Sequence, residues 1–132
     1  MYFDFLIPKR PVSLQTRKTV NLQAWKQYVR GEASKTWTGQ ILSGQDLHLT
    51  LIYLYNSDPV DTDNIIKPIQ DALIGLIYDD DLLITDVDAH RRPLFGTFDL
   101  TLCPILLVQG ITSGIECVYV RVDKSKPLED YL

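Results

Sequence analysis

The spacing of apolar and polar side chains changes several times along the chain, and each spacing predicts a type of element. Residues 2–7 and 47–55 alternate between apolar and polar or are apolar on both faces, which is typical of strands. Residues 21–34 carry apolar side chains at helical spacing, with Gly31 as a point where the helix can break. Residues 65–76 place their apolar side chains on one arc at about 100° per residue, which predicts a second helix.

The second half of the chain predicts mainly strands. The expected ranges are 82–91, 97–108 with an interruption at Pro104, and 115–122, with the last turn at residues 110–114. A polar tail from about residue 123 is expected either to be loosely held or to pack on a partner chain. The order β-α-β-α-β-β predicts an α+β fold: one small domain over residues 1–132, with a mixed or antiparallel sheet and two main helices on one of its faces.

Composition agrees with one domain. The chain has 132 residues, of which 45% are apolar, and this is enough for a single core. Two cysteines are too few for a disulfide scaffold and suit a reducing compartment. The longest apolar run, near residues 103–108, is too short to cross a bilayer. We therefore expect a cytoplasmic protein with no membrane partner.

The net charge of −4 hides an uneven distribution. Residues 1–50 contain seven basic and three acidic side chains, residues 51–90 contain one and nine, and residues 91–132 contain five of each. Bound metal ions would offset part of the acidic excess in the middle of the chain. Basic side chains elsewhere remain for contact with phosphate. They are Lys9, Arg10, Arg17, Lys18, Lys26, Arg30 and Lys35, with Arg91 and Arg92.

Six of these basic residues form two groups. Lys26 and Arg30 fall on the first expected helix, and we interpret them as solvated surface charges. Four others bracket a loop that contains proline and serine, and they are the better candidates for DNA contact: Lys9, Arg10, Arg17 and Lys18.

Six carboxylates surround a single lysine, Lys67, between residues 61 and 81. Carboxylates at this density repel one another unless a cation or solvent screens them. Mg²⁺ and Mn²⁺ take oxygen ligands and keep several waters, so two or three aspartates are enough to hold one. Such an ion activates water and neutralises charge on a leaving oxygen. The cluster therefore indicates metal-assisted hydrolysis of a phosphodiester.

The second expected helix arranges this cluster. Asp63, Lys67 and Asp71 lie four residues apart along its polar side. Asp61 precedes the helix, so Asp63 or Asn64 is the expected N-cap. Pro68 removes a backbone hydrogen bond about one turn into the helix, and a kink or an irregular first turn is expected there.

Each of these side chains also has an ordinary structural explanation. Asp63 can serve only as a helix cap, and Lys67 can simply pair with Asp63 and Asp71 on a solvated face. The run of aspartates at 79–81 is either an exposed turn or a segment that returns to the start of the helix and completes a metal site.

The combined pattern Asp-x-Asp-Asn-x-x-Lys-Pro-x-x-Asp-Ala-Leu, an apolar linker and then Asp-Asp-x-x-Ile resembles the RusA family of Holliday junction resolvases. The likeness is specific over about a quarter of the chain, and the loop of residues 8–18 is similar to the proline- and serine-containing start of the family. The residues on motif positions are Asp61, Asp63, Asn64, Lys67, Asp71, Asp80 and Asp81.

This resemblance implies a small homodimeric endodeoxyribonuclease that requires Mg²⁺ or Mn²⁺. It would resolve four-way DNA junctions by paired symmetric nicks during recombination and repair. Genes of this family are frequent in phages and prophages, so the protein is expected in a bacterial or phage-infected cell. Asp61, Asp63 and Asp81 would be catalytic and would hold the metal with Asp80. Lys67 would stabilise charge on the phosphate, with Asn64 and Asp71 in support.

Two alternatives stay open. The chain can be a non-catalytic protein that binds branched DNA, or a phage assembly protein, which keeps the fold without the activity. It can also be a metal-dependent phosphoesterase that acts on flaps, RNA or nucleotides.

Overall fold

The computed structural model describes residues 2–132, and it contains one four-stranded mixed sheet with three α-helices. The strands lie in the order β1-β4-β2-β3. Their bounds are Phe3–Ile7 for β1, Leu47–Tyr55 for β2, Ile84–Pro93 for β3 and Cys117–Lys124 for β4. The helices are α1 (Thr19–Ser34), α2 (Thr62–Leu73) and α3 (Ile105–Ser113), with short 3₁₀ turns η1 (Asp81–Leu83), η2 (Leu100–Leu102) and η3 (Leu128–Tyr131).

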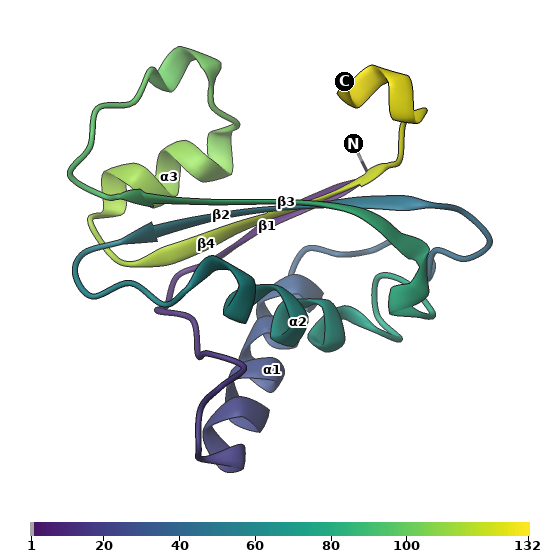
Figure 1. Cartoon of the computed structure of the whole chain (residues 1–132), viewed down its shortest axis with the longest axis horizontal. Helices are drawn as coiled ribbons and strands as arrows, with labels where there is room; N and C mark the ends of the chain where they lie inside the picture. Colours follow the sequence, from purple (N-terminus) through teal and green to yellow (C-terminus); the bar gives the residue numbers. More distant parts are fainter. Residues whose placement is uncertain (1) are drawn as a thin grey trace.

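The pairing of β2 with β3 sets the position of α2. These two strands are parallel, with Tyr53 opposite Arg91, whereas β4 is antiparallel to both β1 and β2. Two parallel neighbours need a crossover connection. The helix α2 supplies it, running from the carboxyl end of β2 back to the start of β3 (Figure 1). The residues that lead into α2 therefore lie at the carboxyl edge of the parallel pair.

Helices α1 and α2 cover one face of the sheet, and α3 covers part of the other (Figure 1). Alternate residues of a strand point to opposite faces. In β2, Leu49 and Leu51 are fully buried in the core under α1 and α2, where Trp25 and Ile69 meet them. Leu54 belongs instead to a smaller cluster on the α3 side. Full burial of an aliphatic side chain contributes about 1.5–3 kcal/mol, so both layers stabilise the domain.

The expected α+β fold with a mixed sheet is confirmed, and the two expected helices lie on one face as predicted. A third helix, α3, was not expected and covers part of the other face. The strand expected at 97–108 is η2 followed by α3. Pro104 is the N-cap of α3, and Gly114 ends it with a φ of 72°. Proline before a helix and glycine after it are typical signals of helix boundaries. The apolar run between them was interpreted as a strand, so these signals were not used.

Glycine positions in the other helical segments also differ from expectation. Gly31 does not break α1, which continues to Ser34. Gly110, expected in the last turn, is buried inside α3, where a Cβ would lie 3.0 Å from the sulfur of Cys117. The close approach of α3 to the sheet therefore depends on the absence of a side chain there.

The polar tail is held against the sheet. Strand β4 extends to Lys124, and η3 follows it. The ring of Tyr131 meets the ring of His48 edge-on at 5.5 Å between centroids, and its hydroxyl accepts a hydrogen bond from the backbone N–H of Lys126. Within residues 2–132, no helix has the length and apolar content needed to cross a bilayer.

Candidate active site

Lys67 is the centre of the acidic cluster. Its ammonium donates a hydrogen bond to the carboxylate of Asp81 and lies 3.0 Å from Oδ1 of Asp71. Asp71 also lies 3.5 Å from the ammonium of Lys26. The expected pairing of Lys67 with Asp71 is confirmed, while its second partner is Asp81, fourteen residues away, rather than Asp63.

These contacts fix the charge of both groups. The hydrogen bonds that Lys67 donates, first to Asp81 and then to Asp71, raise the pKa of its ammonium. The hydrogen bond from Lys67 lowers the pKa of the Asp81 carboxyl below its ordinary value. Both side chains therefore stay ionised throughout the neutral pH range.

The turn between α2 and η1 holds Asp81 at Lys67. The hydroxyl of the buried Tyr78 donates a hydrogen bond of 2.6 Å to the carbonyl of Gln70 in α2. Gly75 has a φ of 79°, and its N–H donates to the carbonyl of Tyr78 at 2.7 Å. A positive φ is easily adopted by glycine alone, so this tight turn depends on Gly75.

Arg30 caps the carboxyl end of α2. Its Nη1 donates to the carbonyls of Ala72 and Ile74 at 3.2 and 2.7 Å. The last carbonyls of a helix have no partner within it, and here a side chain of α1 supplies one. Arg30 is exposed, as expected for a surface charge, but it and Lys26 also have partners in and after α2 that sequence reasoning missed. Nothing in the local spacing shows this, because the contacts join residues more than forty positions apart.

The amino end of α2 carries Asp61 and Asp63. Asp61, rather than Asp63 or Asn64, is the N-cap, although its side chain makes no capping hydrogen bond to the described chain. That side chain is 76% exposed, and its Oδ1 lies 3.9 Å from Nη1 of Arg91. Asp63 is exposed in the first turn. Both carboxylates lie near the positive end of the helix dipole, where a negative charge stabilises the helix.

Asn64 and Pro68 explain how the helix tolerates a proline. A proline has no N–H, so the carbonyl four residues earlier loses its helical donor. That carbonyl belongs to Asn64, and the backbone N–H of Leu14 donates to it at 2.9 Å. The helix continues through Pro68 to Leu73. The loop before α1 is thereby tied to the motif helix, a consequence that local spacing does not reveal.

The predicted metal ligands do not form one cluster in this chain. Among residues 2–132, no group of three or more His, Cys, Asp or Glu side chains lies close enough to hold an ion. Asp61 lies six residues before Lys67, which corresponds to about 9 Å of helical rise. Asp81 pairs with Lys67, and therefore lies at that lysine and not beside Asp61. Asp80 caps η1, accepting from the N–H of Leu82 at 2.9 Å.

Asp61 and Asp63 nevertheless suit Mg²⁺ or Mn²⁺ in their chemistry. They are exposed carboxylates two residues apart, and hard divalent ions prefer such oxygen ligands. A metal-ligand role for them, with Asp81 or Asp80 as a further ligand, stays a prediction.

The four predicted DNA contacts have different surroundings. Arg10 donates to the carbonyls of Ser57 and Asp58 and pairs with Glu116 at 3.2 Å, so it clamps the loop between β2 and α2. The ammonium of Lys9 lies 4.8 Å from the ring centroid of Tyr28. Arg17 and Lys18 are exposed just before α1. Their role in DNA binding stays a prediction, and Arg10 has a structural role that sequence reasoning missed.

A small α+β domain with two exposed carboxylates at one end of a helix, and a lysine paired with two further aspartates along it, has the groups of a phosphodiester-cleaving enzyme. A family model described as endodeoxyribonuclease RusA matches residues 9–96, about two thirds of the chain. The chain therefore belongs to the RusA endodeoxyribonuclease family, a family of nucleases that act on Holliday junctions. A search of curated proteins finds no match.

The family match extends well beyond the motif that suggested it. It includes the loop before α1, both ends of α2 and η1, and it ends just after β3. The helix α3, the strand β4 and the tail lie outside it. Membership in the family, expected from the motif, is confirmed.

Proposed function

We propose that this chain is a divalent-metal-dependent endodeoxyribonuclease that resolves four-way junctions by paired symmetric nicks. The family match over residues 9–96, which contains every motif residue, carries this proposal. We further propose that it acts in DNA recombination and repair as a homodimer, in the cytoplasm of a bacterial or phage-infected cell, and that its gene derives from a phage or prophage.

Asp61 and Asp63 are the proposed first ligands of the ion, Mg²⁺ or Mn²⁺. They are exposed at the amino end of α2, where a substrate has access to them. Asp81, with Asp80 beside it, is the proposed third carboxylate of the site. A bound ion supplies an activated water and neutralises charge on the phosphodiester.

Lys67 is proposed to contact the phosphate while it keeps both carboxylate partners. An ammonium has three N–H donors. Asp71 and Asp81 engage it from the described chain, which leaves one donor for a phosphate oxygen. Because its pKa is raised, the ammonium is fully protonated at neutral pH. A fixed positive charge stabilises the negative charge that develops on a phosphate in the transition state.

The proposal of a homodimer rests on the symmetry of the substrate. A four-way junction has two-fold symmetry, and paired nicks need two equivalent sites. A two-fold symmetric homodimer, the commonest oligomer, supplies them.

The test is cleavage of a synthetic four-way junction with Mg²⁺, with Mn²⁺ and with EDTA. We expect paired nicks that EDTA abolishes. Asp63→Asn should abolish cutting while binding of the junction persists, and Asp130→Asn, an equal change of charge at an exposed position of η3, should cut like the wild type. Wild-type cleavage by Asp63→Asn would remove Asp63 from the mechanism.

The alternatives give different results in the same assay. Wild-type protein that binds the junction in either metal without cutting it would support a non-catalytic branched-DNA-binding protein. Faster cutting of flaps, RNA or nucleotides than of the four-way junction would support a general phosphoesterase.

A further inference from the structure

Arg91 lies at the Asp61 end of α2, away from Lys67. It is near the carboxyl end of β3, the edge strand of the sheet, and opposite Tyr53 of β2. Its Nη1 donates to the carbonyl of Val60 at 3.2 Å and lies 3.9 Å from Oδ1 of Asp61. A second cation thus stands beside the carboxylates at the amino end of α2, at the carboxyl edge of parallel strands where ligands commonly bind.

The guanidinium of Arg91 is held in a fixed position. It lies 6.0 Å from the ring centroid of Tyr55, within the range of a cation–π contact. Together with the bond to Val60, this contact fixes the group from two sides. A guanidinium has five N–H donors in a rigid fork, and the side chain is 36% exposed. Donors therefore remain for a group that approaches from solvent.

A stabilising ion pair does not explain this arrangement well. At 3.9 Å, with Asp61 mostly exposed, the pair contributes little to the free energy of folding, because solvent screens both charges. The hydrogen bond to Val60 accounts for one donor only. An arginine fork suits the oxygens of a phosphate, to which it donates two parallel hydrogen bonds.

We propose that Arg91 is a phosphate-binding residue, which holds the backbone of the DNA strand at the Asp61 end of the site while Lys67 serves the other end. This inference rests on the proposed function, since it takes DNA as the substrate. It names Arg91 as a substrate contact outside the aspartate–lysine motif.

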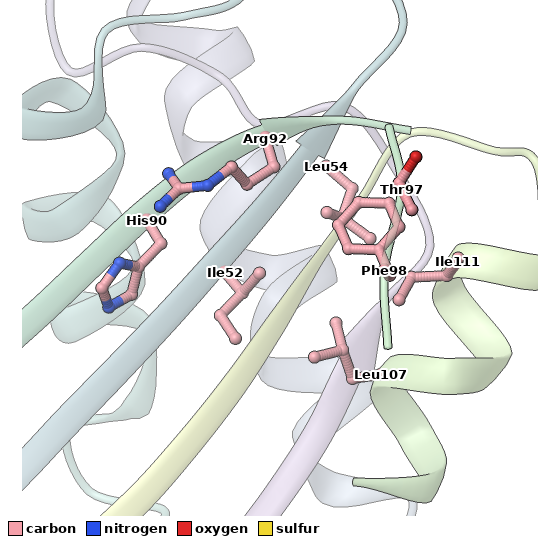
Figure 2. Close-up of a pocket in the computed structure, with 8 residues that line it drawn as sticks. All are labelled: Ile52, Leu54, His90, Arg92, Thr97, Phe98, Leu107 and Ile111. Carbon is pink, nitrogen blue, oxygen red and sulfur yellow. The ribbon is translucent and has the colours of Figure 1, made fainter. Parts of the chain in front are cut away.

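The sequence left Arg92 as a candidate for contact with phosphate, but the structure places its side chain on the opposite face of the sheet from Arg91, so Arg92 provides a matched control. Successive residues of a strand point to opposite faces, and Arg92 lines a pocket of about 270 Å³ on the α3 side of the sheet. Figure 2 shows its guanidinium beside His90 on β3, while Leu54 and Phe98 line another part of the pocket. Replacing Arg91 or Arg92 by Gln removes the same charge from adjacent positions, but only Arg91 lies beside Asp61.

The experiment measures junction binding at several salt concentrations in EDTA, where no cutting occurs. A lost phosphate contact makes the slope of log K against log salt shallower by about one. We expect this change for Arg91→Gln and not for Arg92→Gln. Arg91→Lys should keep the wild-type slope, because it keeps the charge. In Mg²⁺ or Mn²⁺, Arg91→Gln should cut at least tenfold more slowly than the wild type, and Arg92→Gln within twofold of it.

A purely structural role gives a different pattern. Arg91→Gln and Arg91→Lys would then both lower the melting temperature, and neither would change the salt slope; that result would overturn the inference. Equal slopes for Arg91→Gln, Arg92→Gln and the wild type would overturn it as well. Binding is measured without metal, so it does not depend on cutting. A wild-type protein that never cuts would refute the nuclease proposal, but the salt slopes would still test the role of Arg91.

Discussion

Replacing Tyr78 by Phe removes a single hydroxyl from the turn that places Asp81 at Lys67. The Tyr78 side chain is fully buried, and burial raises the pKa of its hydroxyl. That hydroxyl donates a 2.6 Å hydrogen bond to the carbonyl of Gln70. In a regular helix the N–H of Ile74 would serve this carbonyl, but here it donates to Asp71 at 3.3 Å. Tyr78 therefore replaces a missing helical donor.

The expected loss follows from this replacement. A carbonyl left without its donor in a partly buried site costs about 1–2 kcal/mol. For a chain of this size, each kcal/mol lowers the melting temperature by about 3–5 °C. Tyr78→Phe should lose this free energy of unfolding in urea titrations followed by far-UV circular dichroism. The hydrophobic contacts of the ring are unchanged, so no cavity adds to the loss.

Tyr2→Phe is the matched control. The hydroxyl of Tyr2 donates a hydrogen bond of equal length, 2.6 Å, to Oε1 of Gln45, but on an exposed surface where water can replace it. We expect a change of less than about 0.5 kcal/mol. Equal losses for Tyr78→Phe and Tyr2→Phe, or no loss for Tyr78→Phe, would refute the assignment of Tyr78 as a helix cap.

Two further predictions concern charges of the site. Asp81→Asn should lower the free energy of unfolding at pH 7 by less than about 1 kcal/mol, because the ion pair with Lys67 is open to solvent. The pKa of the Asp81 carboxyl is lowered below its ordinary value of 3.8, so the difference between the variant and the wild type should disappear as pH falls below 3.8 and the carboxylate is protonated. Equal differences at pH 7 and pH 2 in urea titrations would contradict this prediction. Arg10→Gln should lower the free energy of unfolding by up to about 1 kcal/mol, because Glu116, which is only 12% exposed, loses its ion pair while water replaces Arg10 at the exposed carbonyls. Arg17→Gln should leave stability unchanged, and equal stability of the two variants would argue against the clamp.

Some of the fold follows from local pattern alone. The alternation of residues 47–55 predicted β2 with the bounds that the structure has. The apolar arc of residues 65–76 predicted α2, and its polar side correctly paired Lys67 with Asp71, because residues four apart on a helix are neighbours. The motif also predicted the family, since the spacing of its aspartates and lysine is a local property of the chain.

The contacts that the sequence did not predict join partners distant in the sequence. Arg30 is exposed as expected, but its hydrogen bonds to the end of α2 form only because α1 lies against that end. The kink or irregular first turn expected at Pro68 stays a prediction, whereas the donor that Leu14 supplies to Asn64 comes from the tertiary fold. The apolar residues of α3 were predicted to form a strand, because a short apolar run fits a buried strand or a buried helix equally well.

The sequence by itself therefore determined the family to which the chain belongs, and it predicted that the aspartates and Lys67 carry the chemistry. The tertiary structure alone decided how these side chains are engaged, with Asp81 bound to Lys67 and Arg91 beside Asp61. The physical reason is range. Helical and strand periodicity act over a few residues, whereas the crossover between β2 and β3 brings together groups fourteen to thirty residues apart.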